Sequence, residues 1–323
     1  MKRLLPYMLL LAFALSACEK VIEFDTTMSQ QELVLNAVPS AGKQLFVNFS
    51  YSFFFIDTTA NQPVPNADMV VSVNGIDYRP IQHVDCNYFF DYTLQENDSL
   101  SIRIDCGDQQ VTAHTHVPLM PDISNPQAFT NDSGAFHLMI VNFNINDHPG
   151  YKDYYYISLQ ERDSGCRYSP YFDRYDTIDT IHTALFFCND QAMINPEALA
   201  EMSIGGFVPC SALLSSDKNI EGQTHNTTMM LMLLRDTNEL AGYIHQYTLC
   251  VESVTYDRYR YLSQSSATAS LMSMITEPPE VYSNVEGALG IFAGNAKQTF
   301  PLLTISYDPI RKSFKDMPLK RRR

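Results

Sequence analysis

Two closely spaced histidines are the first residues in the chain whose types and spacing could do chemistry. His114 and His116 lie in "AHTHVP", and a strand would place both imidazoles on one face, where they could chelate a metal ion. A third ligand at a matching spacing is missing, because the other histidines considered are scattered along the sequence: His137, His148, His182, His225 and His245. Histidines on the exposed face of a strand are the more common use of this pattern, so we predict no metal site.

Acidic residues and tyrosines suggest a second kind of chemistry, the binding or cleavage of sugars. Asp173, Asp176 and Asp179 lie in "FDRYDTID" and could form the carboxylate pair of a glycosidase, although any acidic secreted protein carries such pairs. Tyrosines at 154–156 and 168–175 could stack on sugar rings, but core and cross-strand packing is their more common role. The sequence contains no GxSxG, HExxH, Walker or GxGxxG motif. We therefore predict no catalytic residue and no cofactor.

Six cysteines form an even set, as in a disulfide-linked exported protein: Cys86, Cys106, Cys166, Cys188, Cys210 and Cys250. The first two lie equally far from the centre of a polar "QENDS" turn, so a hairpin would place them opposite each other. Cys166 and Cys188 flank a possible second hairpin, which leaves Cys210 with Cys250. Sequence alone leaves other connectivities open. No CxxC motif occurs, so neither a zinc ribbon nor a redox motif is indicated.

A seventh cysteine, Cys18, ends the longest apolar run. Lys2 and Arg3 precede this run, which is too short to span a bilayer, so residues 1–17 are typical of a signal peptide. "LSAC" at residues 15–18 resembles the bacterial lipobox. This resemblance implies cleavage before Cys18, diacylglycerol on its sulfur and acylation of the new amino terminus. Several acyl chains would anchor the protein stably. The alternative is an ordinary secretory signal with an incidental cysteine.

The residues after Cys18 bear on the membrane in which the protein resides. Glu19 stands where an aspartate retains lipoproteins in the inner membrane of enteric bacteria, so we expect the outer membrane. Glu19, Glu23 and Asp25 resemble the acidic stretch that follows the lipidated cysteine in surface-exposed lipoproteins of Bacteroidetes-type bacteria. A solvated acidic tether, at residues 18–28, is an equally good interpretation.

The elements that must position these residues are predicted to be strands. The chain has 19 Tyr, 19 Phe and no Trp, a supply that favours half-buried pleated surfaces. Short alternating segments such as "SLSIRIDC" and frequent turn signals indicate β-sandwiches of the immunoglobulin or transthyretin-like kind, with little helix. One possible helix runs through Tyr256, Tyr259 and Leu262. The glycine-rich "GALGIFAG" is predicted to be a tight turn and a strand at close backbone approach.

A chain of 323 residues is too long for one ordinary core, so we expect two domains. Pro118, Pro121 and Pro126 form a stiff linker, which sets the boundary near residue 121. We predict an N-terminal β-sandwich domain at residues 29–121 and a C-terminal β-rich domain at residues 122–323.

Charge limits the possible partners. The formal net charge is −14, and loss of Lys2 and Arg3 with the signal peptide makes the mature protein still more acidic. Such a surface repels nucleic acid and anionic lipid headgroups. Membrane attachment is therefore expected through the lipid anchor alone.

Several segments together resemble one family. "PVPNADMVVSV", "DHPGYKDYYYISL", "SSDKNIEGQ", "YDRYRYL" and "EPPEVYSNVEGALGIFAG" occur in this order behind the lipobox. They are similar to Bacteroidetes outer-membrane lipoproteins grouped under a numbered domain of unknown function. The most specific segment is residues 277–294, with Ala288 where glycine is common. Members are often encoded beside TonB-dependent receptors, and no catalytic residues are recognised in them.

The resemblance implies a lipid-anchored, non-enzymatic binding or accessory protein at the outer membrane, working with a TonB-dependent transporter. A surface adhesin or assembly subunit is one alternative, and unpaired edge strands would favour it. A secreted hydrolase is another, and it would need converging acids in a deep cleft with shifted pKa values.

Overall fold

The computed structural model shows a mainly β protein with little helix, which confirms the predicted fold class. It describes residues 31–52, 62–132, 137–194, 207–233, 242–268, 282–308 and 313–317. Among these residues, the predicted helix is present as α3 (Tyr256–Thr268), and no helix is long and apolar enough to cross a membrane. The predicted signal peptide, Cys18 and the acidic tether lie outside the described residues.

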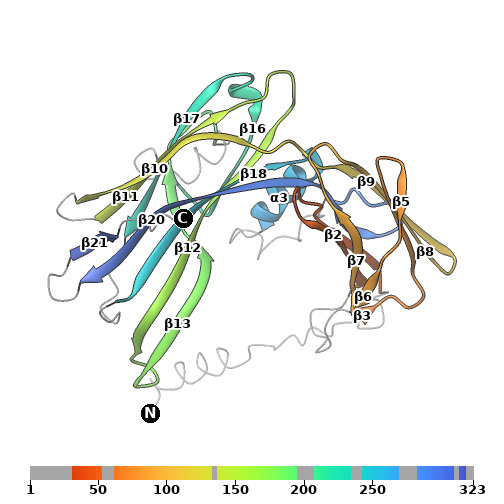
Figure 1. The fold of residues 1–323 in the computed structure, drawn as a ribbon, viewed down its shortest axis with the longest axis horizontal. Helices are drawn as coiled ribbons and strands as arrows, with labels where there is room; N and C mark the ends of the chain where they lie inside the picture. The colour runs from red at the N-terminus through yellow and green to blue at the C-terminus, as the bar shows by residue number, and fades with distance from the viewer. Residues whose placement is uncertain are drawn as a thin grey trace, which may run out of the picture.

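Two sheets form the first lobe, at the right of Figure 1. One has the strand order β19-β1-β2-β7-β6, with β3 beside β2, and the other has the order β5-β4-β8-β9. Both sheets bury their inner residues in one shared core, as in a β-sandwich. The strand bounds are β1 Leu33–Ala37, β2 Gln44–Tyr51, β3 Gln62–Pro63, β4 Asp68–Val73, β5 Ile76–Tyr78, β6 Gln82–Val84, β7 Asn87–Thr93, β8 Ser99–Cys106, β9 Gln109–His116 and β19 Leu289–Phe292.

Two further sheets form the second lobe, at the left of Figure 1. Their strand orders are β10-β11-β17-β14-β15 and β13-β12-β18-β20-β21, and β16 also pairs with β12. A separate hydrophobic core fills the space between them. The bounds are β10 Asp122–Asp132, β11 His137–Asn146, β12 Tyr154–Ser169, β13 Arg174–Thr183, β14 Phe186–Cys188, β15 Val208–Cys210, β16 Ala212–Ser216, β17 Thr224–Leu233, β18 Ile244–Val254, β20 Asn295–Asp308 and β21 Ser313–Met317.

Alternation of apolar and polar residues explains which face of each strand is buried. In β11, Met139, Val141 and Phe143 have no exposed surface, whereas Asn142 and Asn144 between and beyond them are only half-buried. Successive side chains of a strand point to opposite faces, so a period of two places one apolar set in the core. Each fully buried side chain of this size contributes about 1.5–3 kcal/mol to folding.

The expected hairpin around "QENDS" is wrong. β7 pairs with β2 and β6 in one sheet, while β8 pairs with β4 and β9 in the other, so the turn carries the chain between the two sheets. Asp98 is buried at this turn and accepts hydrogen bonds from Gln95 N at 2.7 Å and from Asn74 Nδ2 at 2.7 Å. A polar turn between two alternating strands has the same sequence pattern whether the strands are neighbours in one sheet or belong to two different sheets.

The predicted boundary at residue 121 needs one correction, because the chain returns to the first lobe. β19 pairs in parallel with β1, with Val34 opposite Leu289, and Glu286 forms a bridge with Thr112 on β9. β20 then leads into the second lobe, where it pairs with β18 (Figure 1). The first lobe is therefore assembled from two distant parts of the chain.

Glycines in the "GALGIFAG" segment permit this return. A Cβ atom at Gly290 would lie 2.1 Å from the carbonyl oxygen of Leu35, and one at Gly294 would lie 2.0 Å from the carbonyl oxygen of His116. Atoms so close would overlap, so any side chain here would push β19 off the first lobe. The predicted close backbone approach is confirmed, with the first lobe as the backbone approached.

Candidate functional site

The structure places His114 and His116 on the exposed side of β9. Within the described ranges, the groups of three or more side chains that could hold a metal ion do not include either residue. Both side chains therefore fit the interpretation of histidines on an exposed strand face.

The cysteines are arranged differently from the predicted pairs. All six are thiols, so no disulfide joins them in the described part of the chain. Cys166 lies opposite Thr177 in the β12–β13 hairpin, not opposite Cys188. Cys250 lies between Leu249 and Val251, which face the second core, so its side chain points to the other face of the sheet. Cys210 packs against that core, and the predicted Cys210–Cys250 pair therefore does not agree with the strand geometry.

Two other pairs of cysteines lie in a common neighbourhood. Cys86 and Cys106 both lie near Tyr88, whose pKa is raised by burial and then by the charges of these two thiols. Their predicted bond stays a prediction, now across two sheets instead of across a hairpin. Cys188 and Cys210 are diagonal neighbours on β14 and β15, and burial raises the pKa of each thiol to about 11.

The acidic residues at 173–179 do not converge. Asp179 binds Arg162 through two hydrogen bonds of 2.8 Å, and Asp176 accepts one of 2.7 Å from Arg174. Asp173 accepts one of 2.6 Å from Tyr168, and all three acids lie on the exposed β12–β13 hairpin and its turn. They pair locally and leave no carboxylates facing each other.

The tyrosines follow the packing interpretation. Tyr155 is fully buried, and Tyr154 packs against Tyr259 of α3 with ring centroids 4.9 Å apart. Tyr168 and Tyr175 face each other across the β12–β13 hairpin at 5.4 Å. Cross-strand aromatic contacts of this kind stabilise a sheet without any ligand.

Register brings together four residues that are far apart in sequence. On β12, Glu161 pairs with His182 of β13, and on the other side Asp163 pairs with His245 of β18. Both acids continue the inner face on which Ile157 and Leu159 belong to the core. We call Glu161, Asp163, His182 and His245 the acid–histidine cluster; it lies where the inner face of β12 becomes polar.

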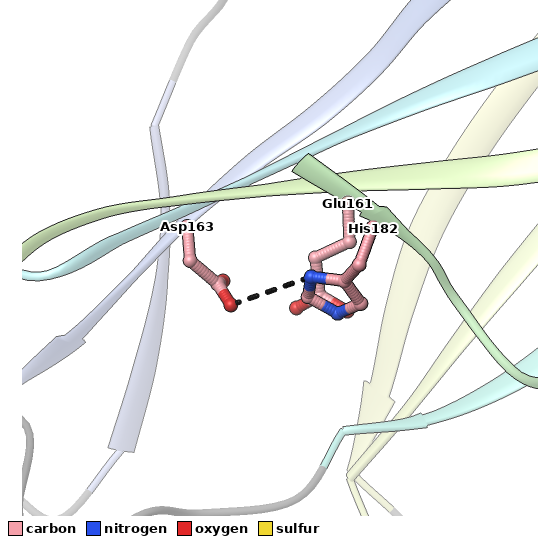
Figure 2. A group of neighbouring side chains, drawn as sticks. All are labelled: Glu161, Asp163 and His182. Atoms are coloured by element: carbon pink, nitrogen blue, oxygen red, sulfur yellow. Dashed lines mark ion pairs between the residues drawn. The ribbon is translucent and has the colours of Figure 1, made fainter. Parts of the chain in front are cut away.

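The cluster is tightly connected. His245 Nδ1 lies 2.9 Å from Glu161 Oε1 and 2.8 Å from Asp163 Oδ1. His182 faces the same two acids, with Nε2 3.3 Å from Glu161 Oε2 and Nδ1 3.7 Å from Asp163 Oδ2. Figure 2 shows the Glu161, Asp163 and His182 side chains pointing toward one another from β12 and β13. One ligand atom from each of these three residues lies within 4.8 Å of the other two.

Electrostatics separates the two acids. Burial raises the pKa of Glu161, but hydrogen bonds from His245 and Tyr247 and the charges of both histidines outweigh it, so the pKa is lowered. Burial and the Glu161 charge raise the pKa of Asp163, and the two histidines only partly offset this. Glu161 is therefore the carboxyl that holds its negative charge more firmly.

A cavity of about 480 Å³ opens beside the cluster. Glu161, His182, His245 and Tyr247 form its polar wall. The other wall is mostly apolar and is lined by Ala184, Leu185, Phe187, Leu231, Met232, Leu233 and Ile305. Small-molecule sites commonly combine an apolar chamber with a few convergent polar groups.

A close backbone contact supports the histidine of β18. Gly165 on β12 has φ +142°, and a Cβ atom there would lie 2.8 Å from Tyr243 Cα. The Tyr243 ring packs against His245 with centroids 5.2 Å apart. Glycine at position 165 thus lets Tyr243 lie close to β12. The Tyr243 ring then holds the His245 imidazole beside Glu161 and Asp163.

In the sequence, His182 and His245 lie far apart and show no ligand spacing, so they are predicted to be isolated. "QERD" places Glu161 and Asp163 on one strand face, which is visible in the sequence. Their partners His182 and His245 are on β13 and β18, and only the strand register shows that they are neighbours. The arrangement can hold a cation, or it can move a proton between a carboxyl and an imidazole.

Comparisons with known proteins give a family and no function. Among curated proteins, no sequence matches this chain. One matching solved structure is described as the complete structure of manganese lipoxygenase of Gaeumannomyces graminis and partial structure of zonadhesin of Komagataella pastoris. Its identity is 8%, with 88% of this chain and 98% of that chain covered, and its TM-score of 0.20 is too low to carry any argument.

A family model for a domain of unknown function (DUF4249) matches residues 19–300. This range contains nearly every strand described above, including β19 and the acid–histidine cluster. The chain therefore belongs to the DUF4249 family.

Proposed function

We propose that this protein is a lipid-anchored binding protein of the outer membrane that holds a small ligand in the cavity of its second lobe. The observation that carries the proposal is the cavity of about 480 Å³, in which a polar wall faces an apolar one; the polar wall contains Glu161, His182, His245 and Tyr247. A site of this size suits a ligand with an apolar body and a cationic or hydrogen-bonding end.

Anchoring through Cys18 supports this role. A tethered protein is confined to a thin layer at the membrane, so weak contacts with a neighbour there are sufficient. The net charge of −14 disfavours binding to nucleic acid and to anionic headgroups. We propose a TonB-dependent transporter of a Bacteroidetes-type bacterium as the neighbour, with this protein in a non-enzymatic accessory role.

Replacement of Cys18 by alanine tests the anchor. The variant should leave the membrane pellet and appear in the soluble fraction, because the acyl chains have no attachment site. Wild type should stay in the pellet after a high-salt wash. A Cys166→Ser variant, altered at an exposed cysteine, is the matched control and should behave as wild type. Retention of Cys18→Ala in the washed pellet would show that lipid anchoring is wrong.

Affinity purification from gently solubilised membranes tests the partner. Deletion of residues 122–323 is unsuitable because it would also remove β19 from the first lobe. Full-length wild type should recover an outer-membrane receptor, and Cys18→Ala should recover much less because it is no longer confined to the membrane. If neither full-length wild type nor Cys18→Ala recovers a receptor, the transporter assignment is wrong.

A hydrolase is the second candidate function, favoured by one observation. Glu161 and Asp163 are neighbouring carboxyls with pKa values shifted in opposite directions, which is the pattern of an acid–base pair. Chromogenic glycosides and esters incubated with wild type and Glu161→Gln would decide. Turnover by wild type that Glu161→Gln loses would support the hydrolase, and no turnover by either would leave the binding role.

A further inference from the structure

We propose that Glu161, Asp163 and His182 bind a divalent transition-metal ion of the Zn²⁺ type at the polar end of the second-lobe cavity. This inference rests on the proposed function, because it assigns the metal ion to the site that holds the proposed ligand. Imidazole and carboxylate are ligands that zinc and its neighbours accept, whereas Ca²⁺ and Mg²⁺ prefer oxygen alone.

The distances fit a site that needs only a small adjustment. Two atoms bound to one tetrahedral zinc at about 2.0–2.1 Å lie about 3.4 Å apart. His182 Nε2 and Glu161 Oε2 are 3.3 Å apart, and the whole set of three ligand atoms lies within 4.8 Å. His182 is the residue that would move, because its side chain is 49% exposed while those of Glu161 and Asp163 are 14% and 17% exposed.

The acids are held in place by groups behind them. Tyr247 donates a hydrogen bond of 2.7 Å to Glu161 Oε1, and His245 Nδ1 lies 2.9 Å from the same oxygen. Glu161 Oε2 is thereby left facing His182 (Figure 2). Such hydrogen bonds behind a ligand fix its orientation and are typical of metal sites. Tyr247 and His245 therefore act as positioning residues.

A buried oxygen that shares its donor supports a cation site independently of the distances between the ligand atoms. Asp163 Oδ1 is inaccessible to solvent, and the His245 Nδ1 that lies 2.8 Å away is also 2.9 Å from Glu161 Oε1, so the two acids share one N–H group. A buried carboxylate oxygen without a donor of its own is costly. Arg162, between the two acids in sequence, binds Asp179 instead and does not supply a charge. A bound cation would compensate Asp163.

The cavity leaves room for an open coordination position. Three protein ligands with space beside them are the arrangement of metal sites that accept an outside ligand, whereas structural zinc sites are closed by four. The apolar wall with Leu231 and Phe187 would receive the body of that ligand. The ion would thus connect the protein to its cargo.

Zinc titration of the metal-free chain tests the inference. The mature chain with Cys18→Ala and Cys166→Ser, which removes the anchor and an exposed soft ligand, is stripped with EDTA and titrated with Zn²⁺ against a chromophoric chelator. We expect one strong site, and Co²⁺ should give the visible bands of a bound ion. Ca²⁺ and Mg²⁺ should not compete.

Variants locate the site. Glu161→Gln and His182→Ala should each weaken zinc binding by more than 10-fold, and Tyr247→Phe by about 10-fold, the range for groups that orient a ligand. The matched control is the double variant His114→Ala/His116→Ala, which should bind as the parent does. Circular dichroism of each metal-free variant confirms folding, and Glu161→Gln keeps the shape of the side chain.

Three outcomes would overturn the inference: no zinc binding by the folded parent, binding unchanged in both Glu161→Gln and His182→Ala, or loss only in the His114/His116 control. Each is separable from the proposed function. Membrane anchoring and receptor recovery by the full-length protein do not depend on the titration, so either proposal can fail while the other holds.

Discussion

At the scale of single residues, Gly290 shows how one absent atom decides the architecture. Its backbone has φ +109°, and its Cα faces the carbonyl oxygen of Leu35 so closely that a Cβ would lie 2.1 Å from that oxygen. Left-handed backbone and lack of space therefore both require glycine. Gly75 has a similar φ of +83° but open space around it, so the two positions separate these effects.

Gly290→Ala should lower the free energy of unfolding by about 2–4 kcal/mol, combining backbone strain with overpacking. Gly75→Ala should cost only about 1–2 kcal/mol, because strain acts there alone. Urea unfolding of both variants and wild type measures the difference. Equal losses in the two variants would mean that β19 does not press on β1 as described.

Asp217 carries a second residue-scale prediction. Burial raises the pKa of Asp217, and together with repulsion from Asp147, Asp153 and Glu221 it outweighs the hydrogen bond of 2.8 Å from Asp153 N. A raised pKa means that the native state holds the proton more tightly than the unfolded state. The free energy of unfolding therefore falls as the pH rises from 3.8 through the higher folded pKa.

Asp217→Asn should remove this fall, because the amide oxygen still accepts from Asp153 N but has no charge. Its stability relative to wild type should increase between acid and neutral pH in chemical denaturation. Asp179→Asn is the control of opposite sign, since its hydrogen bond with Arg162 lowers the pKa of Asp179. If the free energies of unfolding of Asp217→Asn and wild type differed by the same amount at every pH, the raised pKa of Asp217 would be refuted.

At the scale of elements, local patterns predicted strands well and their partners poorly. Alternation in "SLSIRIDC" predicted a strand whose Leu100, Ile102 and Ile104 are buried, and this is confirmed. Nothing in "QENDS" distinguishes a hairpin from a connection between sheets. The same limit hid the acid–histidine cluster, because the register of β12 with β13 and β18 depends on pairing over long sequence distances.

Strand position predicts which cysteines react. Cys166 is exposed on the β12–β13 hairpin, whereas Cys188 on β14 and Cys250 on β18 have no exposed surface. In the reduced native protein, iodoacetamide near neutral pH should modify Cys166 first, since access and thiolate fraction control the rate. Mass spectrometry of timed samples measures the order, and denatured protein is the control. Modification of Cys188 as fast as Cys166 would contradict the placement of β14.

At the scale of the whole molecule, the two lobes are tied by more than the linker at residue 121. β19 completes a sheet of the first lobe, and the following β20 crosses into the second, where it pairs with β18 along eleven residues (Figure 1). The sequence predicted two β-rich units but not this return, because the segment at 277–294 lies far from its partner strand.

A fragment of residues 29–121 should therefore be unstable alone. It lacks β19, so β1 becomes an edge strand and Phe292, a fully buried member of the first core, is missing. A synthetic peptide of residues 282–296 should raise the melting temperature of the fragment, and a peptide with Gly290→Ala should not. A fragment as stable as the whole chain, with no response to the peptide, would show that β19 is dispensable.

The return of β19 also sets an order of events in biogenesis. Gly294 N donates to Thr115 Oγ1 across 179 positions of sequence, so the first lobe cannot close until nearly the whole chain has been synthesised. A chain synthesised from its amino terminus must keep its early strands unpaired until the late segment follows, and such distant pairing makes folding slow. During that interval the edges of β1 and β9 stay open to chaperones, so the first lobe depends on protection from aggregation until the residues near 294 have been made.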